Sequence, residues 1–353
     1  MDARHRELLD LMHGGALPSA DDLRGLIADA PADAREYAAG LARSATLARF
    51  GDAVFVRGLI ECTNYCKNDC LYCGIRAGNS RAERYRLAPE EILECCGTGY
   101  ELGFRTFVLQ GGEDAFFTDD VLVRIVEAIR AAFPGCAVTL SFGERSPEGY
   151  ARLRRAGADR YLLRHETADA AHYSRLHPEG MTLSSRIECL RELKRLGFQT
   201  GAGFMVGSPF QTAAALASDV LFLRELRPEM AGIGPFLPHG GTPFGGYPPG
   251  DVDLTLFMLS LVRLALPCAL LPATTALGTA RQDGLARGIL SGANVVMPNL
   301  SPARARDRYV LYDGKARADR DIADNLSALR DEMAAIGRRI VVDRGDYAER
   351  EIR

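Results

Sequence analysis

From residue 53 onward, short apolar runs alternate with longer amphipathic segments, and this alternation limits the fold more than any other feature. Regular alternation of strands and helices indicates a parallel sheet. Eight strands within 353 residues favour an α/β fold of the closed (β/α)8 TIM-barrel type. The predicted strands are Val54–Ile60, Thr106–Leu109, Ala137–Ser141, Arg160–Leu163, Thr200–Met205, Met230–Ile233, Ala269–Leu271 and Asn294–Met297. The predicted helices are Pro89–Leu102, Asp119–Ala132, Pro147–Ala156, Leu183–Leu196, Thr212–Leu226, Leu254–Leu266 and about Ala280–Leu290.

The chain on either side of this alternation is predicted to be helical. Glu7–Met12, Asp21–Ala28 and Asp33–Phe50 carry helical patterns, and either Ser19 or Asp21 would cap the second. Near the other end, we expect Ile322–Ile336 to form a last helix that, with the tail, closes or covers the bottom of the barrel. We therefore divide the chain into an N-terminal helical extension (1–50), the barrel (51–315) and a C-terminal helix and tail (316–353).

Composition excludes several classes of partner. The chain is 47% hydrophobic and 25% charged, as is usual for a globular protein, and its net charge of −3 gives no sign of a nucleic-acid partner. The sequence shows neither a secretory signal nor an apolar span long enough for a membrane. Nine cysteines, an odd number, favour reduced thiols and metal ligands over disulfides, so we expect a cytoplasmic protein.

Unusual residues gather just after the predicted strands. Barrel enzymes build their active sites from the loops at the carboxyl ends of the strands, so we expect the site there. These segments are Cys66–Gly74, Gln110–Asp114, Ser141–Glu144, Arg164–Thr167, Gly201–Pro209, Gly234–His239, Pro272–Thr275 and Met297–Asn299.

The first of these loops places Cys66, Cys70 and Cys73 at the spacing C-x3-C-x2-C. Three thiolates on one short loop can bind three irons of a 4Fe–4S cluster and leave the fourth iron open. A zinc site would ask for a closed set of four ligands, which no nearby residue completes. His165 and His239 stand alone in the sequence, and we interpret them as hydrogen-bonded structural histidines rather than metal ligands.

The cysteine spacing, with Tyr72 just before the last cysteine, resembles the signature of the radical S-adenosylmethionine (SAM) superfamily. The resemblance implies a 4Fe–4S cluster on the three cysteines, SAM on the open iron, and cleavage of SAM to a 5′-deoxyadenosyl radical. It also implies that Gly111, Gly112 and Glu113 hold the amino group of SAM. Further SAM contacts implied in this way are Tyr72, Gln110, Thr139, Ser141, Glu166 and Arg186. The helical pattern around Arg186, taken alone, favours an exposed salt bridge on the helix over a contact with SAM.

Longer runs are similar to the HydE family of [FeFe]-hydrogenase maturases. The runs are Arg57–Cys73, Tyr85–Glu91, Val108–Asp114, Ala158–Thr167, Gly201–Pro209, Gly232–His239 and Leu271–Thr279. This resemblance implies action on a precursor of the two-iron subcluster of the hydrogenase H-cluster, an organometallic compound in which cysteine binds an iron that carries CO and cyanide. It also implies other hydrogenase maturases and a low-potential electron donor as partners. The positions implied to line the substrate end of the cavity are Arg164, Thr274, Thr275, Met297, Tyr309 and Tyr312.

One departure from the family concerns the number of clusters. Several relatives carry further cysteines near the C-terminus for an auxiliary cluster, whereas Gly314–Asp321 and everything after it contain none. We therefore expect one cluster per chain.

Two alternative functions stay open. A methylornithine synthase-like radical SAM mutase has a similar cysteine loop, although the Arg-His-Glu-Thr and Pro-Ala-Thr-Thr runs favour the maturase. From another class, a non-catalytic iron–sulfur carrier or scaffold would hold a cluster without needing residues for SAM.

Overall fold

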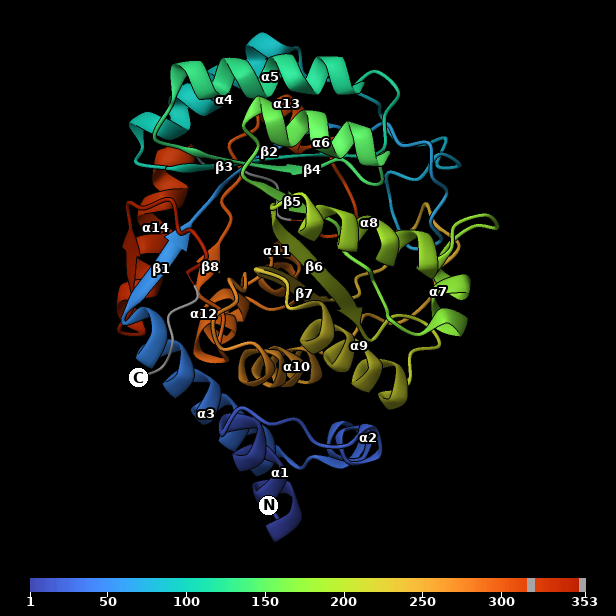
Figure 1. The fold of residues 1–353 in the computed structure, drawn as a ribbon, viewed down its shortest axis with the longest axis vertical. Helices are drawn as coiled ribbons and strands as arrows, with labels where there is room; N and C mark the ends of the chain where they lie inside the picture. Colours follow the sequence, from blue (N-terminus) through green and yellow to red (C-terminus); the bar gives the residue numbers. More distant parts are fainter. Residues whose placement is uncertain (316–320, 349–353) are drawn as a thin grey trace.

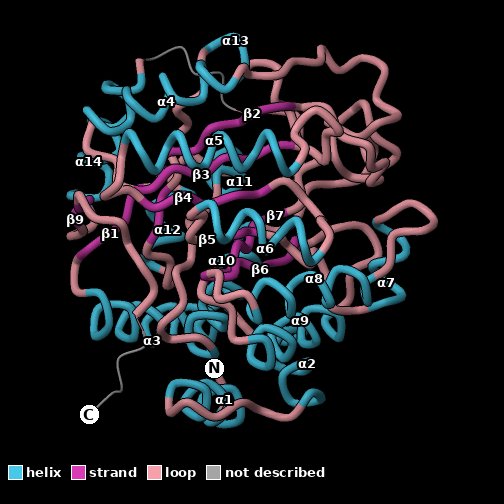
Figure 2. The backbone as a smooth tube through the Cα atoms, turned by 45° about the horizontal axis from the view of Figure 1, so that its top comes forward, coloured by secondary structure: helices cyan, strands magenta, loops and turns pink. Residues whose placement is uncertain are grey.

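The computed structural model describes residues 1–315 and 321–348, and its centre is a parallel sheet surrounded by helices (Figures 1 and 2). Six strands pair in the order in which they follow along the chain, and every pairing is parallel. They are β2 (Gly58–Thr63), β3 (Thr106–Gly111), β4 (Ala137–Ser141), β5 (Arg160–Leu162), β6 (Gln199–Val206) and β7 (Met230–Pro235). The carboxyl ends of these strands therefore share one edge, where the cysteine loop begins.

Short pairings close the sheet into a barrel. Leu270 bridges Met230 of β7, and Pro272 bridges β8 (Val295–Val296). The chain beyond β8 then bridges back to β2 through Leu59 and Asn299. The predicted (β/α)8 barrel is thus confirmed. The predicted strand Ala269–Leu271 is reduced to these isolated bridges, which is consistent with Pro272 having no N–H to donate to a ladder.

The predicted first strand, Val54–Ile60, is divided at Arg57. Its first half, β1 (Ala53–Val56), lies between β8 and β9 (Arg339–Val341), while β2 pairs with β3. Strand β9 was not predicted. The division arises because the two halves of this segment face different neighbours.

The helices around the barrel follow the predicted segments closely. They are α4 (Pro89–Glu101), α5 (Asp119–Ala132), α6 (Pro147–Ala156), α8 (Leu183–Arg195), α9 (Ala213–Leu226) and α10 (Val252–Ala265). The helix expected at about Ala280–Leu290 is instead two, α11 (Thr275–Ala280) and α12 (Gly284–Leu290). Gly284 allows their close approach, since a Cβ there would lie 2.1 Å from the Leu277 carbonyl oxygen. Two short helices, α7 (Ala170–Leu176) and α13 (Ala303–Arg306), were not expected.

The N-terminal helices α1 (Ala3–His13), α2 (Ala20–Asp29) and α3 (Ala32–Phe50) lie on one side of the barrel (Figure 1). α3 packs on α10, and α2 packs on α9. The Ser19 hydroxyl accepts the Asp22 N–H and caps α2. The division of the chain into three parts at residues 50 and 315 stays a prediction.

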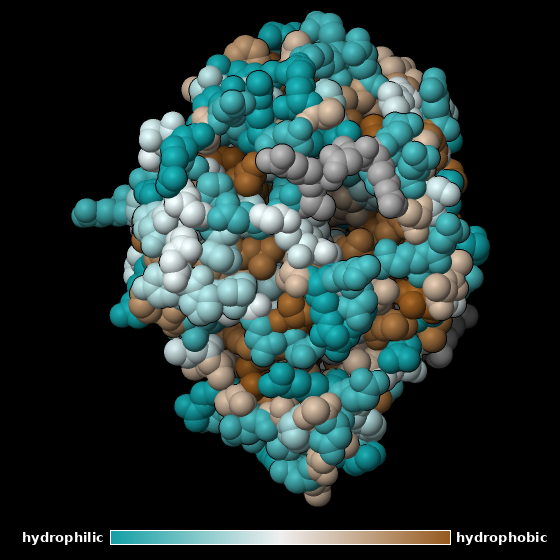
Figure 3. Space-filling model, turned by 180° about the vertical axis from the view of Figure 1, so that it is seen from behind, coloured by the Kyte–Doolittle hydropathy of each residue, from teal (hydrophilic) through white to brown (hydrophobic). Residues whose placement is uncertain are grey.

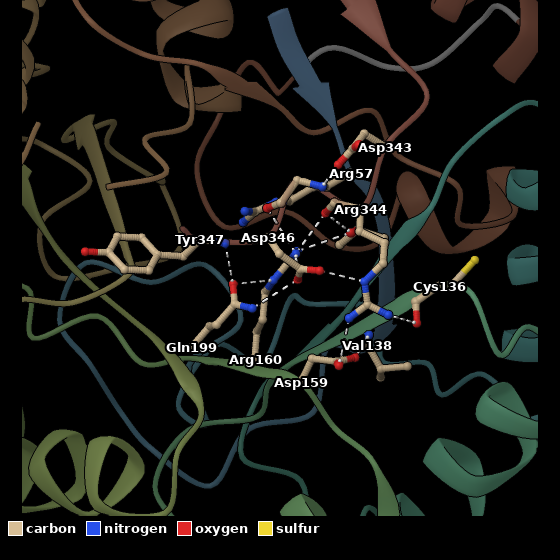
Figure 4. Close-up of polar contacts among 12 residues, drawn as sticks. Arg57, Cys136, Val138, Asp159, Arg160, Gln199, Asp343, Arg344, Asp346 and Tyr347 are labelled. Atoms are coloured by element: carbon tan, nitrogen blue, oxygen red, sulfur yellow. Dashed lines mark hydrogen bonds and ion pairs between the residues drawn. The ribbon is translucent and has the colours of Figure 1, made fainter. Parts of the chain in front are cut away.

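The C-terminal segment reaches the bottom of the barrel, as expected. After α14 (Ile322–Ala335) and β9, the tail lies against the amino ends of β4, β5 and β6 (Figure 4). The buried Arg160 guanidinium donates to the Arg344 and Gly345 carbonyl oxygens and pairs with Asp346 at 2.7 Å. The tail therefore supplies hydrogen-bond acceptors and a carboxylate to the buried Arg160 guanidinium.

The surface of the protein is largely polar. On the face shown in Figure 3, hydrophobic residues appear in scattered patches between hydrophilic ones. Within the described ranges, no helix is long and apolar enough to cross a membrane.

Candidate active site

The cysteine loop leaves the carboxyl end of β2 and is fixed by its neighbours. The Lys67 N–H donates to the Glu113 carbonyl oxygen, and the Leu71 N–H donates to that of Leu176, each at 2.9 Å. One bond ties the loop to the segment after β3, and the other ties it to the end of α7. The loop is thus held on two sides before any ligand is considered.

The thiols of Cys66, Cys70 and Cys73 lie near one another and are partly buried. Burial raises the pKa of all three, and the neighbouring thiols raise the pKa of Cys70 further. The pKa of Cys73 reaches about 12. A bound metal removes this penalty because it stabilises the thiolates directly. In the described part of the chain no three His, Cys, Asp or Glu side chains are placed to hold a single metal ion. A cubane cluster needs its three thiolates farther apart than a single metal ion does, because each thiolate binds a different iron.

The glycine pair after β3 lets two loops touch. A Cβ on Gly112 would lie 2.2 Å from the Tyr65 carbonyl oxygen and 2.7 Å from the Cys66 Cβ. The next residue, Glu113, accepts the Glu144 N–H at 3.0 Å and forms an ion pair with Lys67 at 3.1 Å. Gly112 and Glu113 therefore join three loops at the mouth of the barrel. Their role toward SAM stays a prediction.

The segment after β5 supplies charges that face the interior. Glu166 has a left-handed backbone with φ of 64°, which is unusual for a residue other than glycine. Its carboxylate lies 3.2 Å from the Arg164 guanidinium. Arg186 on α8 donates to the Glu144 carboxylate and to the Arg164 carbonyl oxygen, each at 2.6 Å. The expected salt bridge of Arg186 exists, but the expectation of an exposed side chain was wrong, since the residue is only 7% exposed.

Several polar atoms inside the barrel are buried without a hydrogen-bond partner. They are the hydroxyls of Thr139 and Thr274 and the Nε of Arg164, together with one Glu166 oxygen and the Arg164 Nη2, which form an ion pair with each other at 3.2 Å but no hydrogen bond. A buried polar group without a partner is costly, so native proteins rarely keep one unless a ligand or water satisfies it. Nearby, an added Cβ on the buried Gly232 would meet only the Ala202 carbonyl oxygen, at 4.0 Å. The interior thus has both the hydrogen-bonding groups and the room that a polar ligand needs.

The other predicted residues differ in their surroundings. Gln110 is in register with Ser141, and its amide donates to the Tyr309 hydroxyl at 3.2 Å. Met297 follows β8 and packs against Met230, Leu270 and Val295. Burial raises the pKa of Tyr312 to about 12. Thr275 begins α11 and is exposed, whereas its neighbour Thr274 is half-buried.

Known proteins share this fold and much of this sequence. Residues 60–223 match the model of the radical SAM superfamily. The chain is 48% identical over 265 residues to the [FeFe] hydrogenase maturase subunit HydE of Thermotoga maritima, covering 75% of each chain. The chain belongs to the HydE family. It is also 30% identical over 308 residues to 3-methylornithine synthase of Methanosarcina barkeri, covering 86% of this chain and 85% of the relative. A crystal structure of methylornithine synthase superposes with a TM-score of 0.80 at 26% identity and covers 95% of this chain and 97% of that one.

Membership in the HydE family makes this chain a radical SAM enzyme, and the family implies a 4Fe–4S cluster and SAM. The structure fits both groups. Three adjacent thiols lie at the mouth of the barrel, the Glu166 carboxylate is close enough to raise the pKa of Cys70 and Cys73, and the buried Thr139 hydroxyl on β4 has no hydrogen-bond partner.

The sequence interpretation missed an aromatic group beside the cysteine loop. His177, just after α7, stacks on Tyr173 with ring centroids 3.9 Å apart and donates through Nδ1 to the Tyr173 carbonyl oxygen. Its Nε2 therefore accepts the Tyr72 hydroxyl, at 3.3 Å. The Tyr173 hydroxyl is buried and has no partner. Asp169, which caps α7, was the available signal for this helix.

His165 and His239, which lack metal-ligand spacing in the sequence, both form hydrogen bonds within the protein. His165 Nδ1 accepts the Gly203 N–H, so its Nε2 carries the proton and faces Asp219 at 3.3 Å. His239 Nδ1 accepts the Gly241 N–H at 2.9 Å. In each histidine, a backbone N–H therefore occupies the Nδ1 nitrogen.

Proposed function

We propose that this chain acts on an organometallic precursor of the two-iron subcluster of the [FeFe]-hydrogenase H-cluster. Cys66, Cys70 and Cys73 would hold a 4Fe–4S cluster, with SAM beside it. When bound, the two groups supply a 5′-deoxyadenosyl radical. The observation that carries this proposal is the set of buried, unpartnered polar atoms on the barrel wall below the cysteine loop.

The unpartnered groups suit a ligand that carries a carboxylate, as an iron-bound cysteine does. The Arg164 Nε has no hydrogen-bond partner, and Nη2 has an ion pair with Glu166 but no hydrogen bond, so an incoming carboxylate could take both nitrogens. The Thr274 hydroxyl would donate a further hydrogen bond to it. Thr275, Met297, Tyr309 and Tyr312 complete the substrate end. Without such a ligand, the partly buried Arg164 guanidinium is opposed by the Glu166 carboxylate at 3.2 Å.

SAM is proposed to occupy the level nearer the cysteines. Tyr72 would lie by its adenine, with Gln110, Thr139 and Ser141 along the wall. Gly111, Gly112 and Glu113 would face its amino group, and Glu166 its ribose. Arg186 would meet the SAM carboxylate. Glu144 and the Arg164 carbonyl oxygen already hold the Arg186 guanidinium in one orientation, so little side-chain entropy would be lost on binding.

We further propose one cluster per chain, other hydrogenase maturases as partners, and a low-potential electron donor. The stretch Gly314–Asp321 carries no cysteine, although residues 316–320 lie outside the described part of the structure. The assignment to the cytoplasm is part of the same proposal.

Cell-free activation of an apo [FeFe]-hydrogenase tests the proposal. The reaction would contain the partner maturases, SAM, reductant and this protein reconstituted without oxygen, with Cys73→Ala as the inactive control. Hydrogen evolution that requires Cys73 supports the maturase function. Quantifying 5′-deoxyadenosine in the same tubes shows separately whether SAM is cleaved.

A methylornithine synthase-like mutase is the second candidate, because that enzyme's structure superposes over nearly the whole chain. Formation of 5′-deoxyadenosine without hydrogenase activation would favour it. A loaded cluster that yields neither product would favour the non-catalytic carrier or scaffold.

A further inference from the structure

A buried carboxylate lies inside the barrel, next to the proposed site but outside the predicted set of residues. Glu61 on β2 is in register with Gln110 on β3 and is only 2% exposed. One of its oxygens accepts the Asn299 side-chain amide at 2.8 Å. Since side chains in register on neighbouring parallel strands share a face, Glu61 faces the same interior as Gln110.

The cation that neutralises Glu61 comes from a distant part of the sequence. Lys315 Nζ lies 2.5 Å from the Glu61 carboxylate and donates to the Tyr309 carbonyl oxygen at 2.8 Å. The same ammonium lies 5.1 Å from the centre of the Tyr309 ring. The Lys315 side chain is 13% exposed and the Glu61 side chain 3%. This pair is therefore largely removed from water.

Lys315 ends a segment that crosses the mouth of the barrel, which we call the strap (residues 307–315). Its other attachments are backbone hydrogen bonds and charged contacts nearer the surface, namely the Arg308–Glu83 ion pair at 3.0 Å and the Asp313 carboxylate, which accepts the Gly240 N–H at 2.7 Å. Asn64 donates to the Arg308 carbonyl oxygen at 2.8 Å, and the cysteine loop donates through the Gly74 N–H to Leu311, also at 2.8 Å. The Asp313 N–H donates to Pro238, after β7, at 2.9 Å. The strap thus joins the loops after β2 and β7, and Lys315 is its buried charged anchor.

The anchor controls the position of a residue in the site. Tyr309, on the strap, is 2% exposed, and its hydroxyl accepts from the Gln110 amide at 3.2 Å. Lys315 binds the backbone of Tyr309, while Gln110 binds its hydroxyl. Glu61 lies beside Gln110 on the wall. A strap that needed only stability could use apolar contacts, because burying two charges costs several kcal/mol before they attract one another.

We infer that Glu61 and Lys315 are positioning residues, which latch the strap so that Tyr309 and Gln110 face the ligand in the barrel. The identity of that ligand rests on the proposed function. Breaking either half of the latch frees the strap and lets Tyr309 move from the wall.

Amide hydrogen exchange of the reconstituted protein tests the latch, and the dissociation constant for SAM, measured by calorimetry, tests its effect on the site. The variants are Lys315→Met and the milder Glu61→Gln. The matched control is Lys194→Met. Lys194 also lies 2.5 Å from a glutamate, Glu229, and donates to a carbonyl oxygen at 2.8 Å, but it lies on α8 and pairs with the chain just before β7.

Both latch variants should exchange amides of residues 307–315 at least about tenfold faster, the factor that matches loss of one charged hydrogen bond. SAM binding should weaken several-fold in both variants, and Lys315→Arg should restore much of it. Lys194→Met should change neither quantity. Unchanged exchange in the strap overturns the latch, and faster exchange with unchanged SAM binding overturns the positioning role. Wild-type protein that binds SAM without cleaving it counts against the proposed function and leaves the latch measurement valid.

Discussion

Gly112→Ala should loosen the cluster more than it destabilises the protein as a whole. The added Cβ would lie 2.2 Å from the Tyr65 carbonyl oxygen, whereas ordinary contact begins near 3.4 Å. The obstacle is backbone, so no side-chain rotation can relieve it, and the two loops must separate by roughly 1 Å. Overpacking of this kind costs about 2 kcal/mol, or roughly 3 °C in melting temperature for a chain of this length.

The separation falls on the residue next to Cys66, whose own Cβ would lie 2.7 Å from the new methyl group. We therefore expect the iron content after reconstitution to fall by about half or more, since metal affinity depends on preformed ligand geometry. Iron per chain and thermal unfolding would be measured together. Gly246→Ala is the matched control, because an added Cβ there meets nothing within 4 Å. Wild-type iron content and melting temperature in Gly112→Ala would refute the close contact between these loops.

Two further predictions concern groups away from the ligand. Burial favours protonation of Asp346, but hydrogen bonds from Arg344 and the charge of Arg160 outweigh it and lower the pKa of Asp346 to about 2. Because the folded pKa lies below the ordinary value, its stabilisation is complete above about pH 4 and is lost toward pH 2. Asp346→Asn should therefore reduce the slope of the free energy of unfolding against pH between about pH 2 and pH 4. An unchanged slope would contradict this. Asp219→Ala should cost about 3 kcal/mol in urea unfolding, because it would leave two buried donors, the Ala168 N–H at 2.5 Å and the His165 Nε2–H at 3.3 Å, without an acceptor. A loss no larger than that of the exposed Asp120→Ala would show that the pair does not stabilise the fold.

Local patterns were sufficient for the barrel and for the cysteine loop. The helices α5 and α6 begin and end as predicted, because Thr118 and Ser146 cap them and their apolar faces repeat at the helical period. The cysteine spacing predicted a cluster because three ligands within eight residues need no tertiary structure to come together. The missed helix α7 is short, so its apolar pattern was too brief to be distinguished from a loop.

Only the tertiary structure decided which charges are buried and which residues meet. Arg186 looks like an exposed helix residue in the sequence, yet packing places it against Glu144 and the Arg164 carbonyl oxygen. Glu61 and Lys315 are separated by 254 positions, and nothing in either neighbourhood marks them as partners. The sequence by itself determined the strand–helix order and the cluster ligands, because these depend on contacts within a few residues. The latch, the tail at the bottom and the unpartnered interior atoms depend on how the barrel closes, which brings distant segments together.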